Sequence, residues 1–170
     1  MLRFLQILLV CIFLAVHTQA HTPTKAYKLL VFLDTECPLC QQYSSVINTL
    51  QKKWEKSIPL QIIGIFPSRF VNSTDIEAFK QQYQVNYVCV QDKHLTIVKQ
   101  WKAKVTPEVI LLDAKNTIVY RGLIDNWYYE LGKKRREPTT HYLDEALRAI
   151  SQKQKPLVTQ TSPIGCFIQQ

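Results

Sequence analysis

The chain has 170 residues, of which 46% are hydrophobic, and this length and composition suit one folded domain and exclude general disorder. Four glycines and eight prolines exclude a collagen-like or low-complexity chain. The net charge of +8 falls to +7 on removal of the first 20 residues, whose only charge is Arg3. This excess of positive charge favours acidic partners or an anionic membrane surface.

The first 20 residues have the pattern of a signal peptide. Arg3 precedes an apolar stretch at 7–16 that is too short to span a bilayer comfortably. Small and polar residues follow, and we predict cleavage after Ala20 and export to the periplasm or the extracellular space. A lipoprotein signal at Cys11 is a weaker alternative because the bulky Val10 precedes it. An uncleaved membrane anchor is a further alternative.

Strand-like and helical patterns alternate along the rest of the chain. Apolar runs predict strands at 27–33, 60–66, 87–90, 108–112 and 117–121. Helical spacing of apolar residues predicts helices at 38–55, 74–83, 95–101 and 143–150. A long aromatic and basic loop is expected at 124–138. Early alternation and a late hairpin predict an α/β fold whose mixed sheet carries helices on both faces.

We therefore expect a signal peptide at 1–20, one domain at 27–152 and a C-terminal tail at 153–170. The tail is polar, contains proline and carries Cys166, and we expect it to be mobile.

The strongest functional signal is the pair Cys37 and Cys40, which lies where a buried strand passes into a helix. Unpaired N–H groups and the partial positive charge at a helix N-terminus stabilise a thiolate, the nucleophile in disulfide exchange. Two intervening residues bring the second sulfur round one turn. Cys37 is thus the predicted attacking thiol and Cys40 the resolving thiol, while Pro38 suits the first helical turn.

Other roles for this pair stay open. The two residues could form a structural disulfide or be inert buried thiols. A zinc site is not expected because no second Cys or His pair has matching spacing. A copper site formed with a histidine is an alternative. We expect no resident metal or cofactor.

The chain resembles the thioredoxin superfamily. The resemblance rests on the strand–CxxC–helix arrangement followed by Thr106-Pro107 and a strand hairpin. Further segments resemble the redoxin-domain branch, which includes alkyl hydroperoxide reductase-like and thiol-specific-antioxidant-like proteins; these segments are Val105–Val109, Val119–Gly122, Ile124-Asp125, Tyr142–Leu147 and Pro163–Cys166. The resemblance implies a thioredoxin-like fold, a cis Pro107, and a Thr106-Pro107 backbone that lines the site and binds an extended substrate.

The chain departs from these families at the site itself. Thioredoxins have a buried acid six residues before the first cysteine, where this chain has Val31. Glu36 is an auxiliary candidate that would oppose ionisation of the neighbouring Cys37 if it were close and charged. The Pro-xxx-Thr-xx-Cys pattern of peroxiredoxins is also missing, since Thr35 stands two residues before the cysteine.

Beyond the predicted signal peptide, two further cysteines lie outside the pair. Cys166 is a second auxiliary candidate that could resolve a Cys37 sulfenate, pair with another chain, help to bind a metal, or be an incidental tail cysteine. Cys89 lies in an apolar strand and is expected to be a core residue.

The sequence thus favours an exported thiol–disulfide oxidoreductase acting on protein thiols or disulfides, with an upstream thiol donor or acceptor. A thiol-dependent peroxidase with an antioxidant role, a copper-binding chaperone and a degenerate structural module are the alternatives. Nucleic acid is not an expected partner, because export removes most opportunity for it and the basic cluster at 133–136 suits a solvated loop.

Overall fold

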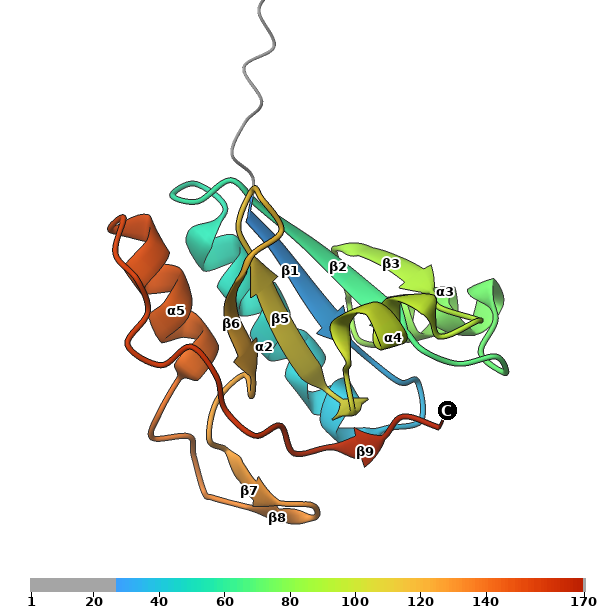
Figure 1. Cartoon of the computed structure of the whole chain (residues 1–170). Helices are drawn as coiled ribbons and strands as arrows, with labels where there is room; N and C mark the ends of the chain where they lie inside the picture. Colours follow the sequence, from blue (N-terminus) through green and yellow to red (C-terminus); the bar gives the residue numbers. More distant parts are fainter. Residues whose placement is uncertain (1–26, 170) are drawn as a thin grey trace, which may run out of the picture.

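A five-stranded mixed sheet forms the centre of the computed structural model, which describes residues 27–169 (Figure 1). The strand order is β3-β2-β1-β5-β6. β1 is parallel to β2, and β2 to β3, whereas β1–β5 and β5–β6 are antiparallel. This mixed sheet confirms the predicted α/β class. Its strands are β1 (Tyr27–Phe32), β2 (Leu60–Phe66), β3 (Val88–Gln91), β5 (Glu108–Leu112) and β6 (Ile118–Gly122).

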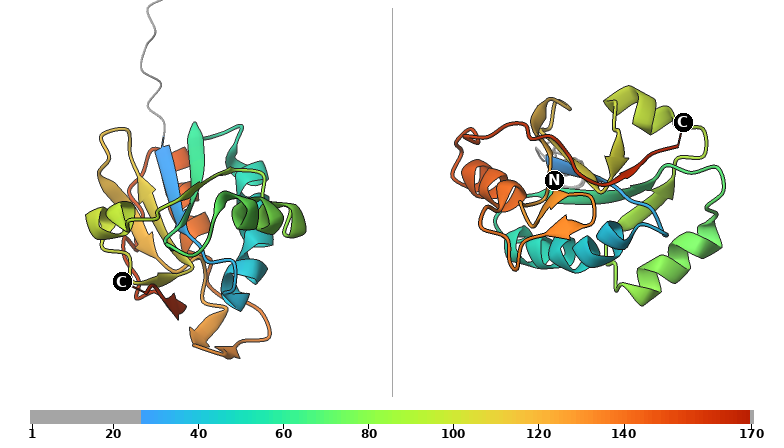
Figure 2. Two further views of the ribbon diagram at one scale, coloured as in Figure 1. Left: turned by 90° about the vertical axis from the view of Figure 1, so that its right-hand side faces the viewer. Right: turned by 90° about the horizontal axis from the view of Figure 1, so that it is seen from below.

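The four helices within residues 27–169 cover the two faces of the sheet unequally. Figure 2 shows α2, α3 and α5 on one face and α4 on the other. Alternation along β1 explains this, because Leu29 and Val31 pack into the larger hydrophobic core while Leu30 and Phe32 pack towards α4. The helices are α2 (Pro38–Trp54), α3 (Ser73–Gln82), α4 (Thr96–Trp101) and α5 (Tyr142–Ser151).

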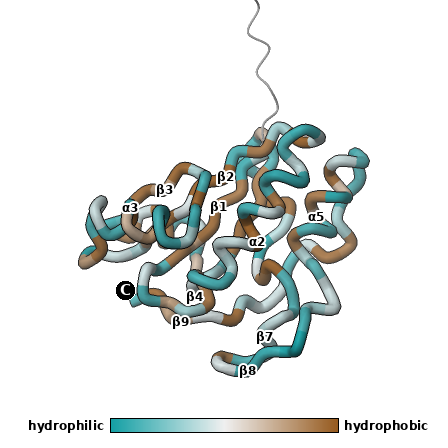
Figure 3. The backbone as a smooth tube through the Cα atoms, turned by 180° about the vertical axis from the view of Figure 1, so that it is seen from behind, coloured by the Kyte–Doolittle hydropathy of each residue, from teal (hydrophilic) through white to brown (hydrophobic). Residues whose placement is uncertain are grey.

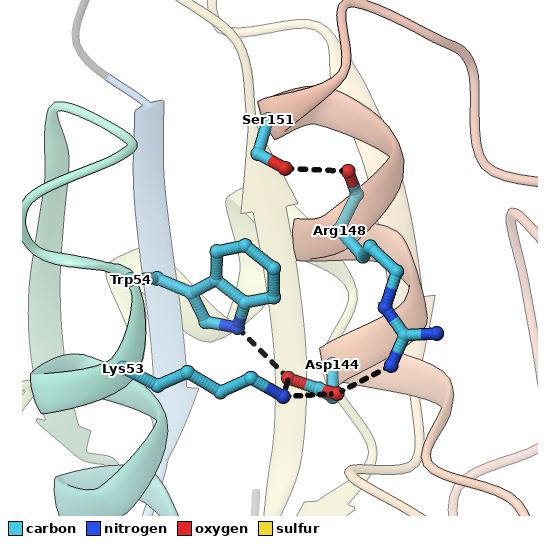
Figure 4. A network of polar contacts seen from close by, with 5 residues as sticks. All are labelled: Lys53, Trp54, Asp144, Arg148 and Ser151. Carbon is cyan, nitrogen blue, oxygen red and sulfur yellow. Dashed lines mark hydrogen bonds and ion pairs between the residues drawn. The ribbon is translucent and has the colours of Figure 1, made fainter.

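A buried carboxylate joins α2 to α5 (Figure 4). Asp144 accepts hydrogen bonds from Trp54 Nε1 and Lys53 Nζ, each at 2.8 Å, and from Arg148 at 3.2 Å. Burial opposes its ionisation, but Lys53 and Trp54 outweigh it and lower the pKa of Asp144. The charged contacts therefore fix the closing helix against the long central one.

The segment expected to be a loop at 124–138 contains a short hairpin, formed by β7 (Tyr128–Glu130) and β8 (Lys133–Lys134). The purely loop-like prediction missed it because two strands this short show no alternation. Trp127 and Tyr128 pack against Tyr43 of α2, with ring centroids 6.1 Å away in both cases. The hairpin is mostly hydrophilic, unlike the strands of the core (Figure 3).

The C-terminal tail, which the sequence predicts to be mobile, is seated against the domain in the structure. After α5 the chain returns across the face that carries α4 (Figures 1 and 2). The N–H of Arg121 in β6 donates to the carbonyl of Thr159, and that of Thr161 donates to the carbonyl of Arg121, each at 3.0 Å. The tail ends in β9 (Cys166–Phe167), antiparallel to β4 (Val105–Thr106). The tail is held by backbone pairing, which does not depend on residue type. Its polar composition therefore predicted mobility and gave no sign of this pairing.

Among residues 27–169, no helix combines the length and the apolar character needed to cross a bilayer. The predicted signal peptide lies outside the described residues.

Candidate active site

Cys37 lies at the N-cap of α2, directly before Pro38 at the first helical position. Its backbone carbonyl accepts the first helical hydrogen bond, from the N–H of Gln41 at 3.1 Å. Its side chain is 2% exposed, and its Sγ lies 3.3 Å from the carbonyl oxygen of Thr106. The predicted position at a strand-to-helix junction is therefore observed, and α2 aims the sulfur at the segment before Pro107.

Cys40 lies one turn further along α2 and is fully buried. Its sulfur accepts a hydrogen bond from the N–H of Asp34 at 3.4 Å. Burial, followed by the neighbouring Cys37, raises the pKa of Cys40. The thiol packs in the same core as the fully buried Val31, which occupies the place of the acid found in thioredoxins.

Cys37 is ionised much more easily than an ordinary thiol. The Cys40 thiol lowers the pKa of Cys37 to about 5, with Cys166 and backbone N–H groups at the start of α2 acting in the same direction and burial opposing them. The Thr106 carbonyl can accept a hydrogen bond only from the protonated thiol and so also opposes ionisation. The thiolate-stabilising contacts prevail, which is the condition for a nucleophilic cysteine.

Glu36 does not prevent this ionisation. Its side chain is exposed to solvent, and its N–H donates to Asp34 Oδ1 at 2.8 Å. Because water screens an exposed carboxylate, its repulsion of a neighbouring thiolate is weak. The helix-end and thiol contacts therefore outweigh the opposing effect that the sequence suggested.

Thr106 and Pro107 lie opposite the cysteine pair, and the peptide bond between them is cis, as the resemblance implied. Glu108 follows directly and is 1% exposed. Its carboxylate accepts hydrogen bonds from the N–H of Lys104 at 3.0 Å and from Arg121 at 2.6 Å. This buried ion pair holds the backbone on both sides of Thr106 in place.

The described cysteines are all free thiols, and no disulfide joins them. Cys166 lines the same groove as Cys37, a cavity of about 600 Å³ that also includes Asp34, Phe70 and Phe167. Cys89 instead packs against the main core from β3, and burial raises its pKa to about 11. The structure thus brings three of the four cysteines within residues 27–169 to one end of the sheet.

A family model for the AhpC/TSA family matches residues 16–121, well over half of the chain. The chain belongs to the AhpC/TSA family. This confirms the predicted redoxin-domain resemblance. No curated protein sequence matches the chain.

Solved structures show that this AhpC/TSA chain has the thioredoxin-like fold. A hypothetical protein from Sinorhizobium meliloti is 21% identical, with a TM-score of 0.74 over 85% of this chain and 80% of that one. A thiol:disulfide interchange protein, described as a putative DsbE, from Chlorobium tepidum is 18% identical, with a TM-score of 0.52 over 58% and 67%. A secreted disulfide oxidoreductase from Mycobacterium tuberculosis is 15% identical, with a TM-score of 0.51 over 76% and 82%. The family and the fold together support a redox role.

The AhpC/TSA chain holds no group of three or more His, Cys, Asp or Glu side chains placed to bind a metal ion within residues 27–169. The copper-binding alternative therefore gains no support from the geometry of the site.

Three contributors to the site are not among those predicted from the sequence. The N–H of Asp34 reaches Cys40, the carboxylate of Glu108 fixes the Thr106 segment, and Gly165 brings β9 against β4. For Glu108, the sequence did offer a signal, because an acidic residue begins an otherwise apolar strand. The other two act through the backbone, which residue type does not reveal.

Proposed function

We propose that this AhpC/TSA protein is an exported thiol–disulfide oxidoreductase with a Cys37/Cys40 redox centre. The observation that carries the proposal is the contrast between the two thiols. Cys37 lines the groove and has a pKa of about 5, whereas Cys40 is fully buried, does not line the groove and has a raised pKa. Cys37 is thus activated for the first attack, and Cys40 lies beside it for the second step.

The chemistry follows from this arrangement. The Cys37 thiolate attacks one sulfur of a substrate disulfide, an S–S bond to Cys37 forms, and the released substrate thiolate takes up a proton. Cys40 then loses its proton, attacks Cys37 Sγ and releases the second substrate thiol. Two electrons pass from the dithiol to the substrate, and the reverse sequence oxidises a substrate dithiol.

The surroundings of Cys37 favour a protein segment as substrate. Phe70 and Phe167 are 80% and 82% exposed at the groove, where water-exposed aromatic rings offer contact area to an apolar chain. The backbone of Thr106 lies at a short strand, β4, which can pair with an extended peptide. Substrates would be cysteine-bearing extended segments, with a second thiol system renewing the pair.

Export is part of the proposal. The pattern of the first 20 residues supports it, and the structurally similar Mycobacterium tuberculosis oxidoreductase is described as secreted. Fractionation of the source cells, followed by N-terminal mass analysis, should find the chain outside the cytoplasm and beginning at His21. A cytoplasmic chain that still begins at Met1 would contradict export without affecting the chemistry.

Reduction of insulin by dithiothreitol tests the catalytic assignment. The native chain should accelerate precipitation of the insulin B chain, and Cys37→Ser should reduce the rate to that of dithiothreitol alone because the attacking sulfur is gone. Cys89→Ser is the matched control and should keep the native rate, since Cys89 lies outside the groove. Equal rates for the native chain and Cys37→Ser would refute the assignment.

Peroxide reduction is a second candidate, favoured by family membership and by the low pKa of Cys37. In that reaction the thiolate attacks a peroxide oxygen, the O–O bond breaks, and a sulfenic acid and an alcohol or water result. Peroxide loss measured in the presence of reduced thiols distinguishes the two. Activity on peroxide without activity on insulin would favour the peroxidase.

A further inference from the structure

The chain's own C-terminal strand occupies the backbone edge beside Cys37. β9 pairs antiparallel with β4, and the register places Cys166 directly across from Thr106, whose carbonyl lies 3.3 Å from Cys37 Sγ. The approach is close, because a Cβ added at Gly165 would lie 2.3 Å from the Thr106 carbonyl oxygen. Only a glycine permits this spacing without a shift of the backbone.

Contacts on both sides position this strand. Upstream, Thr161 Oγ1 accepts a hydrogen bond from the N–H of Leu123 at 2.8 Å and contacts the hydroxyl of Tyr120 at 2.9 Å. Downstream, the N–H of Ile168 donates to the carbonyl of Lys104 at 3.1 Å, and its side chain packs towards the α4 cluster. The strand is therefore specifically seated.

Between these anchors the strand itself is only lightly covered. Cys166 is half-buried, and the neighbouring Phe167 is 82% exposed. β9 has two residues, so few backbone hydrogen bonds hold it. A segment held this way can leave the edge at small cost compared with a strand of the central sheet.

The two thiols at this point influence each other. Cys166 helps to lower the pKa of Cys37, while burial and then Cys37 raise the pKa of Cys166 to about 12. These opposite shifts are those of two neighbouring thiols of which one is ionised. The Cys37 contribution disappears once its sulfur enters a neutral disulfide, and Cys166 then ionises more easily.

We propose that β9 is a tethered substrate analogue and that Cys166 is a third redox thiol which forms a disulfide with Cys37. The proposal rests on the function proposed above. It identifies β9 as the segment that already occupies the edge of β4 at which a substrate peptide would pair. External segments would bind β4 in the place that β9 now holds, so the tail both competes with substrates and completes their release.

The exchange step needs no further oxidant, because one disulfide bond is replaced by another. When Cys37 is joined to an external sulfur, Cys166 loses its proton and attacks Cys37 Sγ. The bond from Cys37 to the external sulfur breaks, the Cys37–Cys166 bond forms, and the external thiolate leaves and takes up a proton. Cys40 can then attack Cys37 in turn, which frees Cys166 and leaves the Cys37–Cys40 disulfide.

Oxidised glutathione tests the proposal on the full chain carrying Cys40→Ser, which removes the competing resolving thiol. Cys37 should first accept one glutathione, and Cys166 should then expel it, leaving a Cys37–Cys166 disulfide that peptide mass mapping identifies. Adding Cys166→Ser should leave glutathione on Cys37. Adding Cys89→Ser instead is the matched control and should not change the outcome.

These results separate the inference from the function on which it rests. Glutathione retained on Cys37 equally with and without Cys166 would refute the third-thiol role and leave the proposed function standing. No glutathione on Cys37 in any of the variants would refute the proposed function and this inference with it.

A glycine substitution tests the pairing without altering a thiol. Gly165→Ala in the Cys40→Ser chain should push β9 from β4 and slow loss of glutathione from Cys37, with the circular dichroism spectrum unchanged. Leu157→Ala is the control, since Leu157 lies in the same tail upstream of β9 and its side chain is fully exposed. Unchanged exchange kinetics in Gly165→Ala would show that seating on β4 is not required.

Discussion

Cys37 and Cys40 are three positions apart on one helix, yet their pKa values move in opposite directions. Both are removed from water, which by itself raises the pKa of a thiol. At Cys37, the Cys40 thiol and the backbone N–H groups at the start of α2 reverse that effect. At Cys40, deeper in the core, the N–H of Asp34 does not compensate for burial and the nearby Cys37.

The Cys40 thiol lowers the pKa of Cys37 through a hydrogen bond between the two side chains, and the reactivity of Cys37 should report this contact. In the reduced chain, the rate of alkylation of Cys37 by iodoacetamide should reach half its maximum near pH 5, the pKa of its thiol. Cys40→Ala removes the principal stabilising donor and should move that midpoint to higher pH. Peptide mass analysis across a pH series measures it, with Cys89→Ala as control; identical midpoints in native and Cys40→Ala chains would refute the explanation.

At the same scale, the sequence predicted the candidate reacting groups better than the groups that support them. Residue type and spacing predicted Cys37 and Cys40, and the family resemblance implied the Thr106-Pro107 segment. They did not determine whether Glu36 would oppose the thiolate, because the answer depends on its exposure. The contribution of Asp34 is a backbone N–H that any non-proline residue has, so its identity gives no warning of it.

Among the elements, α2 and α5 depend on one buried carboxylate. Asp144→Ala should lower the free energy of unfolding by about 1–3 kcal/mol, because Trp54 Nε1 loses its buried acceptor. Urea unfolding measures the change. Glu77→Ala is the control, since the Glu77–Lys80 pair is a surface contact, and it should cost below about 1 kcal/mol. Equal losses from the two substitutions would contradict the assigned role of Asp144.

Elements with a strong apolar pattern were predictable, and those held by their backbone were not. The apolar runs at 60–66 and 108–112 predicted β2 and β5 with the observed bounds. β9 has two residues, and its pairing depends on the absence of a side chain at Gly165. Periodicity cannot report such a contact, so the sequence predicts a mobile tail and leaves open whether Cys166 lies beside Cys37.

For the whole molecule, the ionisation of Cys37 links stability to pH and redox state. The unfolded thiol, with an ordinary pKa of 9.0, holds its proton where the folded thiol, at about 5, has released it. The unfolded state therefore binds more protons in this interval, and stability rises with pH. The contribution is complete above the unfolded value and is lost as the pH falls through about 5. Cys89 and Cys166 act oppositely, but only above the ordinary thiol value.

The reduced chain and the chain carrying a Cys37–Cys40 disulfide should differ in how their stability depends on pH. From about pH 5 to pH 8, the free energy of unfolding of the reduced chain should rise by up to about 1.4 kcal/mol per pH unit relative to the oxidised chain, in which Cys37 has no proton to release. Urea unfolding of both forms at several pH values measures this difference, and parallel pH profiles would refute it. Since whatever stabilises the reduced state makes a disulfide a stronger oxidant, the same thiolate should make the pair an increasingly strong oxidant, relative to a dithiol of ordinary pKa, as pH rises through this interval.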